Sequence, residues 1–248
     1  MPKYLYYLIV LLFQLICSPV FSQEMGYFHK IESIVANTNY APTLLTELDS
    51  LKQTRRPADS KLDVLFNRGI DFEYKQQRII LVLNGSRYQL NLLTKNDTIY
   101  LSAIKFDDTF TPLYPKYKTF KIDTTNALKY LKLRNQFYNS NKTLNELKTE
   151  LSLYEEYVLR GGDGHLETAY KKHLDSLVNR KDINELTNML KSINCEWQTY
   201  GVTGFTMLKN KKVKISKETQ RLIIHIKKRN SELVSCMGDI CAVMLKAF

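Results

Sequence analysis

Positive charge is concentrated in two short segments of the chain. Residues 114–142 hold seven basic and one acidic residue, and residues 209–229 hold nine basic and one acidic residue. Clustered cations bind anionic partners such as phosphorylated lipid headgroups, acidic glycans or nucleic-acid strands. The residues expected to form such a surface are Lys116, Lys118, Lys121, Lys132, Arg134, Lys211, Lys212, Lys214, Lys217 and Arg221.

The same mixture of cations and aromatic residues also arises without any binding role. Amphipathic strands and helices turn lysines toward water and aromatic side chains toward the core, which places both kinds of residue in one segment. The two interpretations differ in geometry. A binding surface requires the two basic segments to meet on one face, whereas solvated outer faces can point in any direction.

Removal of an expected N-terminal signal that contains Cys17 leaves three cysteines, Cys195, Cys236 and Cys241. A disulfide between Cys236 and Cys241 is one hypothesis, which requires a turn between them. In one continuous helix the two would lie about 140° apart around the axis and about 7.5 Å along it, which disfavours a bond. A bond from Cys195 to either of them, or three buried unpaired thiols, are the alternatives.

No spacing of Cys and His residues matches a zinc site, so neither a metal nor another cofactor is expected. Asp163, His165 and Glu167 alternate after two glycines, but a helix start with Asp163 as its cap explains them. Glu196 lies beside Trp197, the only tryptophan, and an acid among aromatic residues is typical of a glycan-cleaving site. The edge of an ordinary core accounts for the same pair.

Residues 1–22 have the layout of a cleavable secretory signal. Lys3 precedes an apolar run over residues 4–16, Pro19 follows it, and cleavage after Ser22 fits the small residues near that position. An uncleaved membrane anchor and lipidation at Cys17 are alternatives. Export places the chain in a periplasmic or extracellular compartment, where nucleotide-dependent functions are not expected.

Composition excludes several classes of protein. The chain has 248 residues, is 44% hydrophobic, carries a net charge of +11 and contains 9 glycines, 6 prolines and 4 cysteines. These values exclude a disordered chain, a collagen-like repeat and a cysteine-stapled miniprotein. With only one long apolar run, a polytopic membrane protein is excluded as well.

The apolar periodicity predicts an α+β fold with N-terminal helices, an antiparallel β-meander of about three to five strands and a helical C-terminal half. Residues 23–66 have helical spacing, with Pro42 in a first turn. Residues 78–104 contain three short strands, with a hairpin at Asn84-Gly85, and flanking strands are expected near Tyr74 and Ile122. We divide the chain into residues 1–22, 23–140 and 141–248; the last two ranges are either two domains or parts of one domain.

Capping signals locate the later helices. Helices are expected after Thr124 or Thr125, over 144–158 behind a capping box at Thr143, over 166–177, and after Asp182 and Ser216. Residues 201–215 are predicted to form a small hairpin. Beyond Asn230 a seven-residue apolar spacing favours one long helix, against a turn at residues 237–239.

These observations support an exported, non-enzymatic protein that binds an anionic envelope component or a partner protein, with at most peripheral membrane contact. A secreted hydrolase acting on glycan or peptide is the first alternative. An inhibitor or immunity-type binding protein is the second, because such proteins carry no catalytic residues of their own.

Overall fold

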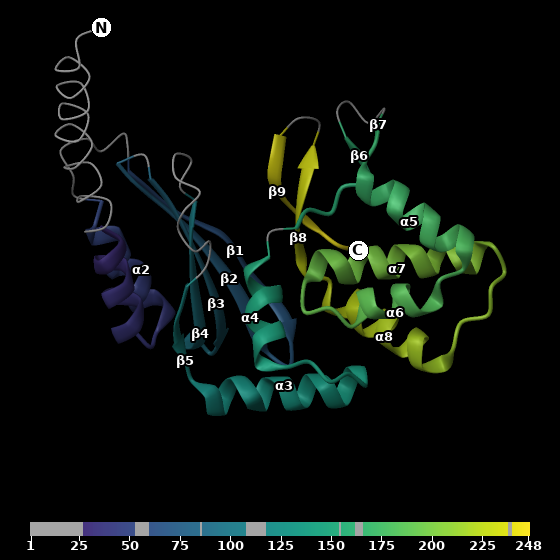
Figure 1. The fold of residues 1–248 in the computed structure, drawn as a ribbon, viewed down its shortest axis with the longest axis horizontal. Coiled ribbons are helices and arrows are strands. Elements are labelled where there is room, and N and C mark those ends of the chain that lie inside the picture. Colours follow the sequence, from purple (N-terminus) through teal and green to yellow (C-terminus); the bar gives the residue numbers. More distant parts are fainter. Residues whose placement is uncertain are drawn as a thin grey trace, which may run out of the picture.

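The computed structural model describes residues 27–52, 60–84, 86–107, 118–153, 155–161, 166–237 and 240–248. Its fold is α+β, as predicted (Figure 1). A sheet lies between two groups of helices, and a further helical layer and a hairpin follow it. Residues 1–22, the expected signal, lie outside the described residues.

Two helices precede the sheet, over residues 27–37 and in α2 (Ala41–Ser50). Pro42 occupies the first turn of α2, as predicted, and Leu44 and Leu48 are buried against the sheet. The helical prediction for residues 23–66 is wrong at its end, because residues from Lys61 onward are already in a strand.

The five-stranded antiparallel sheet has the order β1-β2-β3-β4-β5. Its strands are β1 (Lys61–Asp71), β2 (Tyr74–Leu83), β3 (Ser86–Lys95), β4 (Thr98–Asp107) and β5 (Lys118–Ile122). The turns at Phe72-Glu73 and Asn96-Asp97 have positive φ at both residues, and Asn84 has a φ of 50°. Positive φ at both central residues is the type I′ pattern, whose twist suits two-residue hairpins.

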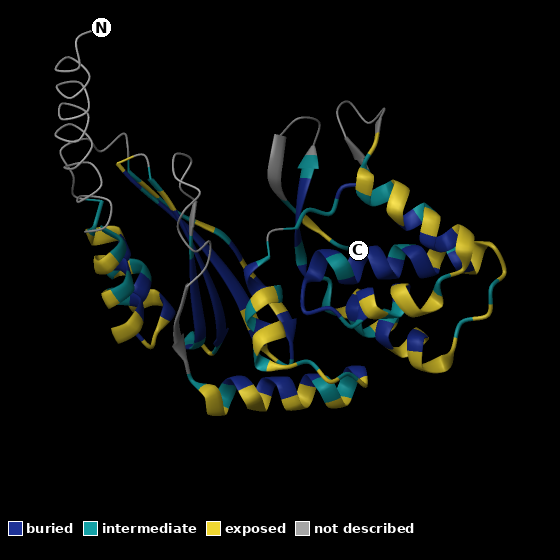
Figure 2. Cartoon of the chain, in the orientation of Figure 1, coloured by how far each residue is buried: buried dark blue, intermediate teal, exposed yellow. Residues whose placement is uncertain are grey.

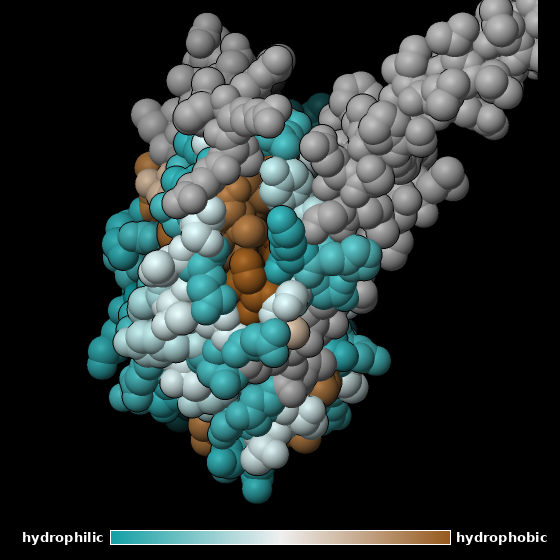
Figure 3. Space-filling model, turned by 90° about the vertical axis from the view of Figure 1, so that its left-hand side faces the viewer, coloured by the Kyte–Doolittle hydropathy of each residue, from teal (hydrophilic) through white to brown (hydrophobic). Residues whose placement is uncertain are grey.

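Both faces of the sheet are covered. Leu90 and Leu92 of β3 pack with the N-terminal helices, whereas Leu93 packs with α3 (Thr124–Tyr138) and α4 (Leu144–Ser152). Gln89 and Asn91, the polar residues that alternate with these leucines on β3, are therefore buried as well. Figure 3 shows the end of the molecule that carries the N-terminal helices, where a narrow strip of apolar side chains is visible between hydrophilic ones.

The C-terminal half is organised around α7 (Cys195–Asn210), which is buried along most of its length (Figure 2). The other helices are α5 (Ala169–Arg180), α6 (Ile183–Leu190) and α8 (Lys217–Arg229). Short strand pairs are β6 (Arg160–Gly161) with β7 (Leu166–Glu167), and β8 (Glu232–Met237) with β9 (Ile240–Lys246).

The predicted hairpin over residues 201–215 is wrong, since 201–210 belong to α7. Gly201 and Gly204 are helical, and a Cβ atom at either would press against Leu186 or Leu190 of α6. The two glycines therefore serve close packing between helices, not a turn. Asn194 caps the helix by accepting from the backbone N–H of Trp197.

The long C-terminal helix is also wrong. α8 ends at Asn230, which has a left-handed backbone with a φ of 45°, and β8 and β9 follow as an antiparallel pair. The apolar residues after Asn230 form two short runs on either side of residues 238–239, which fits a pair of strands, and Leu233 is buried in the core beside α3 and α4.

The caps are partly as predicted. Thr143 and Glu146 form the capping box, and Asp182 and Ser216 cap α6 and α8. Asp123, not Thr124 or Thr125, caps α3, and α4 ends at Ser152 instead of 158. Thr168 caps α5, and Glu167 lies in β7; Asp163 lies outside the described residues.

Within the described part of the chain, no helix combines the length and apolar character that a membrane crossing requires.

Candidate binding groove between α7 and α8

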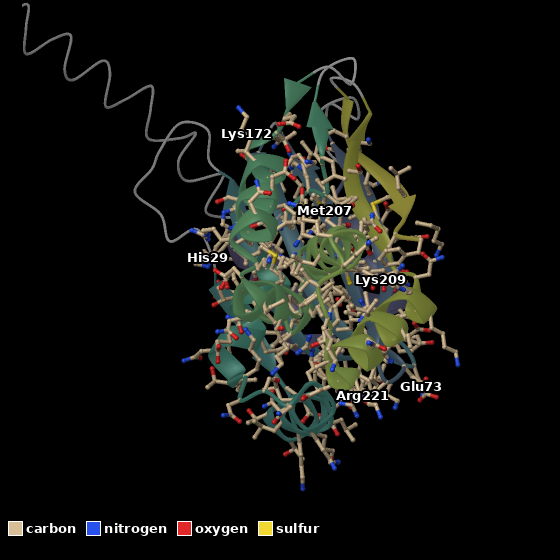
Figure 4. The ribbon with its side chains drawn as sticks, turned by 90° about the vertical axis from the view of Figure 1, so that its right-hand side faces the viewer. His29, Glu73, Lys172, Met207, Lys209 and Arg221 are labelled. Atoms are coloured by element: carbon tan, nitrogen blue, oxygen red, sulfur yellow. The ribbon has the colours of Figure 1, made fainter. Side chains whose placement is uncertain are left out.

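A hollow of about 680 Å³ lies between the C-terminal half of α7, the loop after it and the outer side of α8. Its apolar residues are Phe205, Val213, Ile215, Ile223 and Ile224. Four lysines line it as well: Lys209, Lys214, Lys217 and Lys227. We call this hollow the α7–α8 groove. Figure 4 shows this end of the molecule, with Met207 and Lys209 from α7 and Arg221 from α8.

The loop between the two helices shapes the groove. α7 ends at Asn210, Lys212 takes a positive φ of 60°, and the Val213 N–H donates to Leu208 O over 3.0 Å. Ser216 then caps α8 through the Thr219 N–H. This tight reversal places the half-buried Val213 and Ile215 beside the helices and leaves the lysines exposed.

The electrostatics of the groove are one-sided. Of its lining residues, four are cationic and none is acidic. Ile224 is 65% exposed among them. The polar lining side chains already have partners, because Thr206 Oγ1 donates to Val202 O and Gln220 Nε2 donates to Ile215 O. The groove thus offers aliphatic surface and ammonium charge.

The second predicted basic segment largely surrounds this groove. Lys214 and Lys217 line it, and Lys212 is exposed in the loop. Lys211 donates to Asn179 Oδ1, and Arg221 donates to Phe137 O with its guanidinium 4.8 Å from the Phe137 ring. The sequence analysis did not identify the aliphatic lining of the groove, because Val213 and Ile215 were assigned to a hairpin.

The first basic segment does not form a comparable surface in the described residues. Lys132 is exposed on α3, but Arg134 is fully buried and donates to the carbonyl oxygens of Lys191 and Ser192. Arg134 is therefore not part of any surface. Lys116 and the side chains of Lys118 and Lys121 lie outside the described residues.

A buried charge network holds the inner side of α8 against the sheet. Asp71, at the end of β1, accepts hydrogen bonds at Oδ1 from Tyr138 (3.0 Å), His225 (2.8 Å) and Arg229 (2.8 Å). Arg134 Nε lies 3.5 Å from Asp71 Oδ2. Burial by itself raises the pKa of Asp71, but the hydrogen bond from His225 and the neighbouring guanidinium charges outweigh it and lower that pKa.

A second buried pair joins the sheet to α7. Arg68 of β1 contacts both carboxylate oxygens of Glu196, at 2.5 and 3.0 Å, and Glu196 also accepts from the Val234 N–H. Burial lowers the pKa of Arg68, and the Glu196 charge more than offsets that and raises it. Glu196 is 1% exposed and fully engaged, which leaves it no access to a substrate.

The remaining chemistry-bearing residues are dispersed. His29 is near Glu32, His173 is exposed on α5, and His165 lies outside the described residues. No group of three or more potential ligands in the described ranges could hold a metal ion. Cys195 is free and buried.

Cys236 is disulfide-bonded and lies directly opposite Cys241 in the β8–β9 register. The Cys241 side chain lies outside the described residues, so the pairing of these two cysteines stays a prediction. The strand reversal between them is the arrangement that this pairing requires.

Comparison with known proteins supplies no relative: the chain matches no family model, no curated protein and no solved structure.

Proposed function

We propose that this chain is an exported, non-enzymatic protein that docks peripherally on an anionic lipid surface of the envelope through the α7–α8 groove. The observation that carries the proposal is a groove lined by aliphatic residues and four lysines, with no acid among the lining residues. Each lysine near an anionic membrane contributes about 1 kcal/mol to binding. Ile224, an exposed residue of the lining, adds an apolar side chain that can enter the interface.

Export is supported by the signal-like layout of residues 1–22. A non-catalytic role is supported by the burial and pairing of two carboxylates. Asp71 and Glu196 are buried and paired with arginine, so neither is placed to transfer a proton to a substrate.

The test compares two charge variants of the processed protein in co-sedimentation with phosphatidylglycerol vesicles. The groove variant changes Lys209, Lys214, Lys217 and Lys227 to Gln. The control changes four exposed lysines elsewhere, Lys30, Lys75, Lys129 and Lys172, and so has the same net charge.

We expect the unmodified protein and the control to bind at low salt and to be released at high salt. The groove variant should bind up to about a thousandfold more weakly, because it loses up to about 1 kcal/mol at each of four lysines. Equal binding by both variants would assign the affinity to net charge and refute a specific docking face. Absence of binding by the unmodified protein at low salt would refute the function itself.

A further inference from the structure

The α7–α8 groove is a hollow with volume, not a flat patch. Its volume of about 680 Å³ falls within the range of roughly 300–1,000 Å³ that small-molecule sites occupy. A flat cationic face would suffice for docking on a membrane. The hollow therefore has room for one small molecule with a defined shape.

The chemistry of the lining disfavours several classes of occupant. A neutral sugar is best held by side chains that both donate and accept hydrogen bonds, and the lining has only Thr206 and Gln220 of this kind, which already donate to backbone carbonyls of their own helix and loop. A nucleobase needs an aromatic platform, and the one aromatic lining residue, Phe205, is only 1% exposed. The groups left to contact an occupant are branched aliphatic side chains and lysine ammonium groups.

The aliphatic residues of the groove match the apolar chain of an amphiphile, and its lysines match an anionic head. Val213, Ile215 and Ile223 are half-buried and pack against the core beneath, so they form a preformed apolar surface. The lysines stand exposed at the rim, where their flexible stems allow the ammonium groups to reach an anionic head.

We propose that the groove binds one single-chain anionic amphiphile, with its aliphatic chain on Val213, Ile215, Ile223 and Ile224 and its phosphate or carboxylate head among the four lysines. This inference rests on the proposed docking face and specifies what that face recognises. An acidic amphipathic peptide is the competing occupant, and the experiment distinguishes it.

The experiment follows isoleucine δ1-methyl NMR signals of the processed protein during titration with dodecyl phosphate below its micelle concentration. We expect saturable shifts for Ile215, Ile223 and Ile224. Ile31 and Ile79, buried against the other face of the sheet, serve as internal controls and should not move. Inorganic phosphate should shift none of these methyls, and neutral dodecyl maltoside should bind about tenfold more weakly, the loss of about 1.4 kcal/mol of charge attraction.

A blocking variant tests whether the amphiphile occupies the groove. Thr206→Trp replaces an exposed lining residue by a large ring and keeps all four lysines. We expect it to lose dodecyl phosphate binding. Unchanged urea denaturation checks that the variant folds.

Each outcome has a definite meaning. If vesicles bind but dodecyl phosphate moves no groove methyl, the inference is overturned and the docking function stands. If an acidic amphipathic peptide moves these methyls and dodecyl phosphate does not, the groove belongs to a protein partner. If Thr206→Trp binds dodecyl phosphate as the unmodified protein does, the amphiphile lies elsewhere.

Discussion

Asp71 is the residue on which the seating of α8 depends, because one carboxylate oxygen accepts from both His225 and Arg229 of that helix. It is 1% exposed, and it also faces Arg134 and Tyr138 of α3. Sequence reasoning missed this network and assigned Arg134 to the surface. The partners are separated by 63 to 158 positions along the chain, and no local pattern links them.

Replacing Asp71 by Asn should destabilise the protein by about 3–5 kcal/mol. The amide keeps the shape but leaves the Arg134 and Arg229 guanidinium groups buried without their counter-charge. Urea denaturation measures the loss. The matched control is Asp63→Asn, whose carboxylate is 44% exposed and paired with Lys61, and it should change stability by at most about 1 kcal/mol. Equal effects of the two changes would contradict the network.

Asp71 also predicts a pH dependence. The pKa of Asp71 in the folded protein lies below its ordinary value of 3.8. Its contribution to the free energy of unfolding is therefore fully present above pH 3.8 and is lost as the pH falls through the lower folded-state pKa. The unmodified protein should therefore lose stability more steeply below about pH 4 than Asp71→Asn. Denaturation series at several pH values measure the difference. Parallel curves would show that Asp71 does not titrate with folding.

At the scale of elements, alternation and turn residues predicted the meander, and capping residues predicted the starts of α4, α6 and α8. The errors fall where a local pattern fits two structures. Residues after Asn230 fit one helix by their seven-residue apolar spacing and two strands by the turn position at residues 237–239, and the packing of Leu233 against the core decides between them. The hairpin predicted over residues 201–215 is wrong for a related reason. Gly201 and Gly204 allow α6 to approach α7 closely, and sequence spacing does not reveal that contact.

Gly204→Ala tests the close packing of α6 against α7. Alanine favours a helix by about 1 kcal/mol, but its Cβ would collide with Leu186 and crowd Leu174. Overpacking costs about 1–3 kcal/mol, so a net loss of stability is expected in thermal or urea denaturation. Gly69→Ala is the control, since a Cβ there meets nothing within 4 Å. A stabilising Gly204→Ala would show that α6 and α7 are less tightly packed than described.

For the whole molecule, the basic residues behind the net charge of +11 lie in different environments. Arg134 belongs to the buried network around Asp71, whereas four lysines of residues 209–229 line the α7–α8 groove. Arg221 brings α8 into contact with the end of α3 at Phe137, so the two segments touch there. Composition predicted an excess of cations, but not which of them are buried, because burial depends on partners that only the folded chain supplies.

The docking face itself is tested most directly by tryptophan quenching in vesicles whose lipid chains carry a quencher. Ile224→Trp places a probe on the proposed docking face. Val64→Trp places one on β1, about 23 Å along the strand from Asp71, the residue that contacts the inner side of α8. Both parent residues are exposed, and the unmodified protein supplies the Trp197 background. Docking through the α7–α8 groove predicts strong quenching of the probe at position 224 and little at position 64. Equal quenching at the two positions, or stronger quenching at 64, would contradict it.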